Sequence, residues 1–199
     1  MGNLPLYLYA YYEYRKPTVT RILKHVPSGG SIVELGSGTG LLLILLSAMG
    51  FRTLGIDSSP EVIRLAQDLN SRLDANAKFL EMDLFAAGSV GRFDLSYSEG
   101  VIEHFKGDLL DKSINIHKQL GKRVLIVVPC VNPSNEPDQE NYSYQKLAKV
   151  GKRNGLRPID QYPIGAGRWA TKLLPPFLLN RLGGKTIPCL DVGMVFSPD

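Results

Sequence analysis

The chain has few cysteines and no long apolar run. Its two cysteines, Cys130 and Cys189, are too few for a disulfide framework and lack the close spacing of metal ligands. We therefore expect no metal site, and a reducing cytoplasm as the compartment. No run of about 18 apolar residues could cross a membrane, and the N-terminus lacks the basic and apolar regions of a signal peptide.

Internal repeats, low-complexity linkers and a strong excess of one charge are also missing. The 199 residues carry 23 basic and 19 acidic side chains, and 44% of them are hydrophobic. This length and composition allow one domain with a single large core, so we predict one domain over residues 1–199.

A glycine-rich turn at residues 31–40 (SIVELGSGTG) narrows the function more than any other feature. The β-branched start predicts a strand, which cannot continue through Gly36, Gly38 and Gly40. The chain must turn tightly there and let bare backbone approach a ligand. The apolar stretch 41–49 predicts a buried helix whose free N-terminal N–H groups face that ligand, as in nucleotide-binding sites.

The spacing of these glycines separates two cofactor classes. They fall as G-x-G-x-G, with Leu41 where the dinucleotide fingerprint G-x-G-x-x-G needs its last glycine. Glu34, two positions before the first glycine, is unfavourable beside a pyrophosphate and favourable near a cation. The turn therefore indicates a ligand that carries positive charge.

At these positions the sequence resembles the class I S-adenosylmethionine-dependent methyltransferases, whose first motif is similar to residues 33–40. Residues 52–57 resemble the family's second strand, which ends in the acid that binds the ribose hydroxyls, and residues 77–83 resemble the third strand, with Asp83-Leu84 against the adenine. Residues 93–98 and 123–129 resemble the fourth and fifth strands. The cofactor-binding residues that the resemblance implies are Glu34, Gly36, Ser37, Gly38, Gly40, Asp57, Ser58, Asp83, Leu84, Ser98 and Glu99.

Strand and helix patterns alternate along the middle of the chain, with helices predicted over 61–73 and 107–120. This order predicts an α/β, doubly wound, Rossmann-like sheet, mainly parallel, with helices on both faces and the ligand at the carboxyl ends of the strands. The resemblance implies about seven strands, the sixth within 155–164 and an antiparallel seventh within 190–196. It also divides the domain into an N-terminal lid (1–27), a cofactor-binding core (28–130) and substrate-side loops with the last strands (131–199).

Methyl transfer requires a base only when the acceptor arrives protonated. His104 is the candidate, because it follows the fourth strand in the segment that resembles the cofactor-closing part of the family. Tyr97 and Glu103 are weaker candidates, and His25 and His117 fall in predicted helices away from the strand ends. A structural histidine is the alternative interpretation of His104.

Two further features bear on the acceptor. Residues 142–185 include nine basic residues and one acidic residue, Asp160. This excess of positive charge suits an anionic substrate or a solvated helix face, and nucleic acid stays open as a partner. The stretch 168–181, with the single tryptophan, is either packed on the sheet or a lid over an apolar substrate. Five tyrosines lie between Tyr7 and Tyr14, where they either pack or line the substrate pocket.

The sequence thus predicts an enzyme that moves a methyl group from S-adenosylmethionine to a small molecule, anionic or apolar, and leaves S-adenosylhomocysteine. Two alternatives stay open: a NAD(P)-binding oxidoreductase, and a protein that binds S-adenosylmethionine without turnover and serves as a regulatory module. The acceptor atom and the oligomeric state are not specified by any motif.

Overall fold

The computed structural model describes residues 4–130, 139–165 and 191–198, with the side chains of residues 4–10 and 12 left out. The stretch 168–181, Cys189 and most of the loop after the fifth strand lie outside the described residues, as does much of the basic segment.

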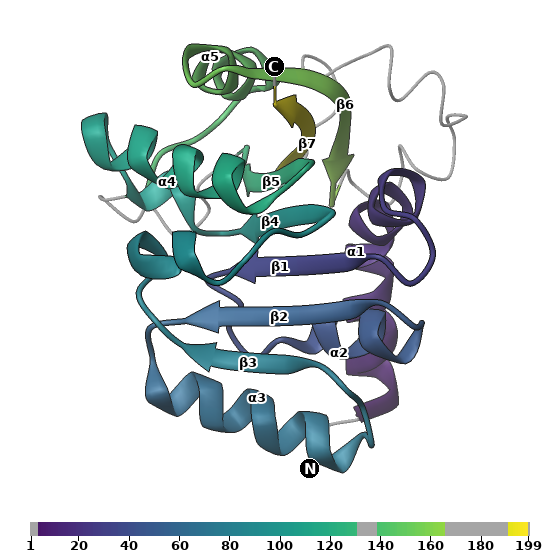
Figure 1. Cartoon of the computed structure of the whole chain (residues 1–199). Coiled ribbons are helices and arrows are strands. Elements are labelled where there is room, and N and C mark those ends of the chain that lie inside the picture. The colour runs from purple at the N-terminus through teal and green to yellow at the C-terminus, as the bar shows by residue number, and fades with distance from the viewer. Residues whose placement is uncertain (1–3, 131–138, 166–190, 199) are drawn as a thin grey trace, which may run out of the picture.

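The centre of the molecule is a seven-stranded sheet in the order β3-β2-β1-β4-β5-β7-β6 (Figure 1). The first five strands are parallel, and β7 runs antiparallel to its neighbours β5 and β6. The predicted mainly parallel sheet with an antiparallel last strand is therefore confirmed. The strands are β1 (Ser31–Leu35), β2 (Arg52–Asp57), β3 (Lys78–Glu81), β4 (Leu95–Glu99), β5 (Val124–Pro129), β6 (Leu156–Ile164) and β7 (Asp191–Pro198).

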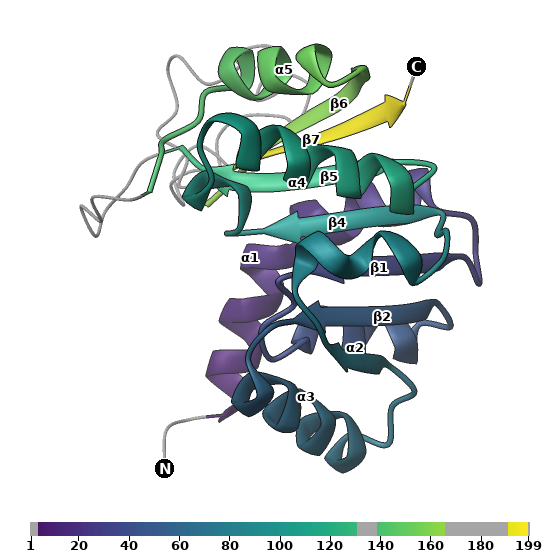
Figure 2. The same cartoon turned by 60° about the vertical axis from the view of Figure 1, so that its left-hand side comes forward.

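Helices cover both faces of this sheet (Figure 2). Helices α4 and α5 pack on one face with Leu110 and Leu147 in the core, and α1 and α2 pack on the other with Ile22 and Leu43. In the described parts of the chain every helix is too short or too polar to cross a membrane. The helices are α1 (Leu4–His25), α2 (Leu41–Ala48), α3 (Pro60–Arg72), α4 (Gly107–Leu120) and α5 (Tyr144–Arg153), with short 3-10 helices η1 (Leu84–Ser89) and η2 (Ile102–His104).

Two elements differ in detail from the sequence prediction. Strand β3 is shorter than residues 77–83, because the carboxylate of Asp83 accepts a hydrogen bond from the Phe85 N–H at 2.7 Å and begins η1. Strand β6 contains Pro158 and Pro163, and it is an edge strand of nine residues that pairs with β7. An edge tolerates proline because the missing N–H has no partner strand to serve.

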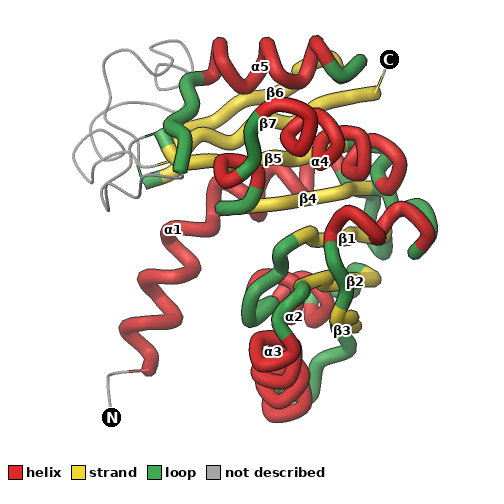
Figure 3. Tube along the Cα trace, turned by 90° about the vertical axis from the view of Figure 1, so that its left-hand side faces the viewer, coloured by secondary structure: helices red, strands yellow, loops and turns green. Residues whose placement is uncertain are grey.

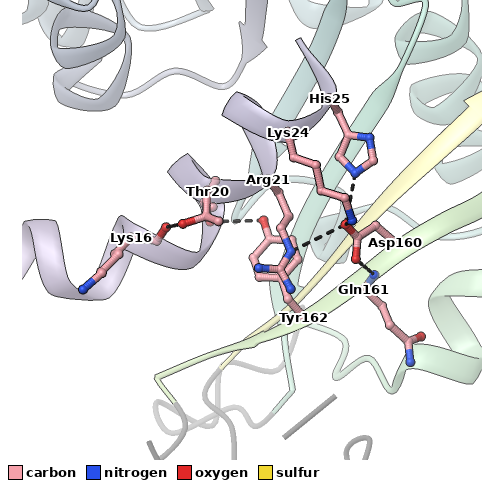
Figure 4. A network of polar contacts seen from close by, with 9 residues as sticks. Lys16, Thr20, Arg21, Lys24, His25, Asp160, Gln161 and Tyr162 are labelled. Carbon is pink, nitrogen blue, oxygen red and sulfur yellow. Dashed lines mark hydrogen bonds and ion pairs between the residues drawn. The ribbon is translucent and has the colours of Figure 1, made fainter. Parts of the chain in front are cut away.

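Helix α1 contacts β6 through polar side chains as well as through the apolar core (Figure 4). The Tyr162 hydroxyl donates to Thr18 Oγ1 at 3.1 Å, and further along the helix Arg21, Lys24 and His25 surround Asp160. Burial alone would raise the pKa of Asp160, but hydrogen bonds from Lys24 and His25 and the charge of Arg21 hold it below its ordinary value.

The other end of α1 reaches the carboxyl ends of the strands. Figure 3 looks onto those ends and shows the N-terminal part of α1 extending past the sheet, apart from α2 and α3. Because the contacts of α1 with β6 run from Thr18 to His25, the residues near position 14 come to lie over the edge at which β5 and β6 end. The fold thus brings α1 to the edge where the sequence motifs gather.

Candidate functional site

The glycine turn lies between β1 and α2, and all three of its glycines have positive φ: 68° at Gly36, 54° at Gly38 and 63° at Gly40. A Cβ at Gly40 would lie 2.1 Å from the ring of Phe79, and one at Gly36 would lie 2.5 Å from Val101. At Gly38 a Cβ would meet no atom within 4 Å. Two glycines are therefore needed for packing as well as for φ, and the third leaves the backbone open to a ligand.

A cavity of about 220 Å³ lies against this turn at the carboxyl ends of β1 and β4. The glycine turn lines one side of the cavity. Strands β1 and β4 contribute the carboxyl groups of Glu34 and Glu99, and α1 contributes the side chains of Tyr11 and Arg15. Six of the residues predicted from the sequence meet here. The lining residues are Tyr11, Arg15, Glu34, Gly36, Ser37, Gly38, Thr39, Gly40, Leu41, Leu42 and Glu99.

Glu34 is a buried carboxyl in this wall, with only 6% of its surface exposed. Its Oε2 and the hydroxyl of Ser37 have no hydrogen-bond partner among the described residues. Burial raises the pKa of Glu34 to about 8, the charge of Arg15 acts against that shift, and the charge of Asp57 adds to it. A buried carboxyl with an unpaired oxygen favours a ligand that donates hydrogen bonds and carries positive charge.

Asp57 ends β2 behind the glycine turn. Its Oδ2 accepts the Gly38 N–H at 3.0 Å and its Oδ1 accepts the Ser59 N–H at 3.0 Å. Each carboxylate oxygen keeps a further lone pair, so the group can still accept from a vicinal diol. The backbone contacts fix the carboxylate in the orientation that such a ligand requires.

The remaining predicted cofactor residues lie outside the cavity wall. Ser58 and Asp83 are exposed, Leu84 is half-buried in η1, and Ser98 is buried with its hydroxyl unpartnered among the described residues. Ser58 follows β2, Asp83 and Leu84 follow β3, and Ser98 lies near the end of β4, all along one edge of the sheet. Their contact with a cofactor stays a prediction.

Arg15 of α1 is the site residue that sequence reasoning missed. It forms an ion pair with Glu99 and donates to the Tyr97 hydroxyl at 3.4 Å, while the Tyr97 hydroxyl donates to Glu99. Its guanidinium lies 5.2 Å from the ring centre of Tyr11 and 5.4 Å from that of Tyr14. One basic residue in a tyrosine-rich stretch gave no spacing signal, because its partner Glu99 lies far along the chain.

The same contacts bear on the N-terminal tyrosines. Tyr11 lines the cavity, Tyr14 packs against the core beneath α1, and the side chains of Tyr7, Tyr9 and Tyr12 lie outside the described residues. The rings of Tyr11 and Tyr14 both make cation-π contacts with Arg15. The two roles considered for these tyrosines, packing and lining of the site, are therefore both present.

The histidines are placed differently from one another. His104 is exposed at the end of η2 and is not part of the cavity wall, so its catalytic role stays a prediction. His117 is buried in α4, where its Nδ1 lies 2.7 Å from Ser96 Oγ and burial lowers its pKa to about 3. Burial also raises the pKa values of Glu103 and Tyr97, the weaker candidates.

Residues 7–157 match the model of a family described as a methyltransferase domain. The chain belongs to this family. The matched segment contains the glycine turn, the residues that line the cavity and the first five strands. The match supports the methyltransferase prediction over the oxidoreductase alternative.

Several known proteins of similar sequence or structure are named as methyltransferases. The ribosomal protein L11 methyltransferase of Thermus thermophilus is 32% identical over 85 residues, which cover 43% of this chain and 34% of that protein. A solved structure of magnesium protoporphyrin IX methyltransferase from Synechocystis with bound S-adenosylmethionine superposes with a TM-score of 0.68 at 15% identity, covering 92% of this chain and 77% of that one.

A second solved structure is the 1,6-didemethyltoxoflavin-N1-methyltransferase of Burkholderia thailandensis, with a TM-score of 0.70 at 15% identity over 96% of this chain and 81% of that one. At such identities the two structures show a shared fold. The match to the Thermus protein spans about a third of that relative's length.

Proposed function

We propose that this methyltransferase domain binds S-adenosylmethionine and transfers its methyl group to a small-molecule acceptor. The observation that carries the proposal is the unpaired, buried carboxyl of Glu34 beside an open glycine turn, with the Asp57 carboxylate fixed behind it. These features of the protein suit a ligand with an ammonium group at Glu34, a nucleoside linkage at the glycine turn and a ribose diol at Asp57.

The residues present fit such a cofactor. Glu34 and the Ser37 hydroxyl would accept from its amino group, Arg15 would face its carboxylate with the guanidinium edge that Glu99 leaves free, and Asp57 would hold its ribose. Asp83 and Leu84, one strand further along the sheet, would flank its adenine. When bound, S-adenosylmethionine supplies a methyl group on a positively charged sulfur that leaves as S-adenosylhomocysteine.

The chain's own contribution to catalysis is then positioning. The glycine turn and Asp57 fix the cofactor from the side of β1 and β2, and α1 covers it through Arg15. Holding donor and acceptor in near-attack geometry supplies a large share of the acceleration of a displacement reaction. A small acceptor accords with the substrates that the names of the two structural neighbours give.

Calorimetric titration with S-adenosylmethionine, S-adenosylhomocysteine and NAD tests the cofactor. We expect both sulfur compounds to bind and NAD not to bind, and Asp57→Ala to weaken binding at least about tenfold, since charge-assisted hydrogen bonds contribute about 1.5–3 kcal/mol. Asp68→Ala removes the same charge from an exposed position on α3 and should bind as the wild type does. Binding of NAD alone would reject the proposal.

Turnover distinguishes an enzyme from a regulatory module that only binds the cofactor. The wild-type protein is incubated with S-adenosylmethionine labelled in its methyl group and a panel of small phenols, amines and thiols, with ribosomal protein L11 as a macromolecular comparison. Label in a small molecule supports the proposal, whereas cofactor binding without any labelled product would favour the binding module.

A further inference from the structure

Four carboxyl groups of the sheet face α1, and they differ in the cations beside them. Glu99 pairs with Arg15, Glu34 feels the charge of Arg15, and Asp160 has Arg21, Lys24 and His25. Asp191 accepts a hydrogen bond from the Tyr14 hydroxyl, and no ion pair to it occurs within residues 4–130, 139–165 and 191–198. A half-buried acid that has no cation among the described residues needs an explanation that the three others do not.

The position of Asp191 suggests one. It begins β7 and lies opposite Pro129, the last residue of β5, and Ile164, the last residue of β6. Its side chain therefore stands at the edge of the sheet where the cavity lies. Two residues along the strand, a Cβ at Gly193 would meet the Tyr162 ring, which packs beneath α1 together with Tyr97. Asp191 and Glu99 thus share the face that α1 covers.

The proposed orientation of the cofactor indicates which part of the ligand lies near Asp191 at the edge of the sheet. Asp57 ends β2 and Asp83 follows β3, on one side of the glycine turn, so these residues would hold the ribose and adenine on that side. The methyl group would then be presented on the other side, toward β4, β5 and β7. Tyr14 lies there, next to the cavity wall, since its ring centre is 5.4 Å from the Arg15 guanidinium.

We propose that Tyr14 and Asp191 form a proton relay that accepts the proton of the methyl acceptor, an inference that rests on the proposed function. The acceptor's O–H or N–H donates to the Tyr14 oxygen while Tyr14 donates to Asp191. The lone pair of the acceptor forms the new bond to the methyl carbon, and the carbon–sulfur bond breaks with its electrons on sulfur. The acceptor's proton passes to Tyr14, whose own proton passes to Asp191, leaving a neutral carboxylic acid and a methylated product.

The pH dependence follows from the groups around the pair. Burial raises the pKa of Asp191 to about 6. The titratable and charged groups on the described elements packed there include Tyr11, Glu13, Arg15 and Lys16 on α1, Tyr162 and Asp160 on β6, Glu99 at the end of β4, and Cys130 after β5. Asp191 accepts a proton only as the carboxylate, so methyl transfer should rise as pH increases through about 6.

The first test needs no acceptor. Carboxyl carbons are labelled with ¹³C in aspartate, and the protein with bound S-adenosylhomocysteine is titrated by NMR. We expect one signal with a midpoint near 6, absent in Asp191→Asn and shifted upward in Tyr14→Phe, because the hydroxyl stabilises the carboxylate. A midpoint near 4, the ordinary value for aspartate, would overturn the relay.

The second test uses the acceptor that gives turnover in the panel above. Asp191→Asn should lower kcat by about 10²–10⁴-fold and remove the rise near pH 6, without changing the affinity for S-adenosylhomocysteine. Asp160→Asn, the same change at a position clamped by cations, should keep the pH profile. Loss of the rise in His104→Ala and its retention in Asp191→Asn would assign the proton to His104 and reject the relay. A panel without turnover would count against the proposed function and with it the relay, whereas a midpoint near 4 in the NMR titration would overturn the relay alone.

Discussion

The two halves of the sheet build their parts of the site in different ways. Around β1 and β2 the contacts join residues close in the chain: the Gly38 backbone N–H donates to the Asp57 carboxylate, and the two residues are 19 positions apart. Around β6 and β7 they join side chains from opposite ends, since Tyr14 and Asp191 are 177 positions apart and His25 and Asp160 are 135 apart. The cofactor half is thus set by local backbone geometry, and the half proposed to meet the acceptor is set by side-chain contacts with α1.

Gly40 and Gly38 offer the strongest way to break the cofactor half. Gly40→Ala places a Cβ 2.1 Å from Phe79 at a φ of +63°, so we expect a loss of about 2–5 kcal/mol from overpacking and left-handed strain together. Gly38→Ala meets open space at a φ of +54° and should cost about 1–2 kcal/mol from strain alone. Urea unfolding of the two variants measures the difference. Equal losses would mean that Phe79 moves aside and the packing argument fails.

Asp160→Asn breaks the other half. It leaves Arg21 and His25, both largely buried, without their carboxylate, and should cost about 1–3 kcal/mol. The pKa of Asp160 is lowered in the folded protein. Its contribution to the stability of the fold is therefore present at pH values above the ordinary pKa of aspartate and is lost as pH falls through the lowered pKa. The variant should therefore lose less stability on acidification than the wild type. Hydrogen exchange should rise mainly in α1, and a uniform rise over the sheet would contradict a role in clamping the helix.

The pH dependence of cofactor binding tests the role of Glu34 in the half of the site around β1 and β2. Its pKa is about 8 in the unliganded site, and an ammonium group binds the carboxylate, so affinity for S-adenosylmethionine should rise as pH increases toward 8, up to about tenfold per unit. Calorimetry in buffers of different ionisation enthalpy should detect a proton released on binding near pH 7. Glu34→Gln should show neither effect, and proton release from that variant would point to another group.

Ser59→Ala is the smallest of these changes. The Ser59 hydroxyl caps α3 by accepting the Val62 N–H at 3.3 Å, and removing an N-cap costs about 1 kcal/mol. Cofactor affinity should stay the same, because the Ser59 N–H that holds Asp57 belongs to the backbone. A large loss of affinity together with unchanged stability would show that the hydroxyl itself contacts the ligand.

The sequence by itself determined the family, the mainly parallel sheet and the glycine turn that lines the cavity. Strand, glycine turn and helix are local, so residues 31–57 carry in their order the positive φ values and the Asp57 contact that the structure shows. The helix predicted over 107–120 and the second strand have the predicted bounds for the same reason. The close packing of Gly40 and Gly36 is against Phe79 and Val101, which come from later segments.

Only the tertiary structure decided which side chains of α1 lie over the glycine turn and which partners they contact. Arg15 meets Glu99, and Tyr14 meets Asp191, because α1 crosses the sheet and brings these two residues of the helix to the edge where β7 begins. These pairs have no periodicity or spacing along the chain, since each is made by two segments that fold together only through the packing of α1 on β6. Burial, which raises the pKa values of Glu34 and Asp191, is likewise a property of the packed molecule and not of the residues alone.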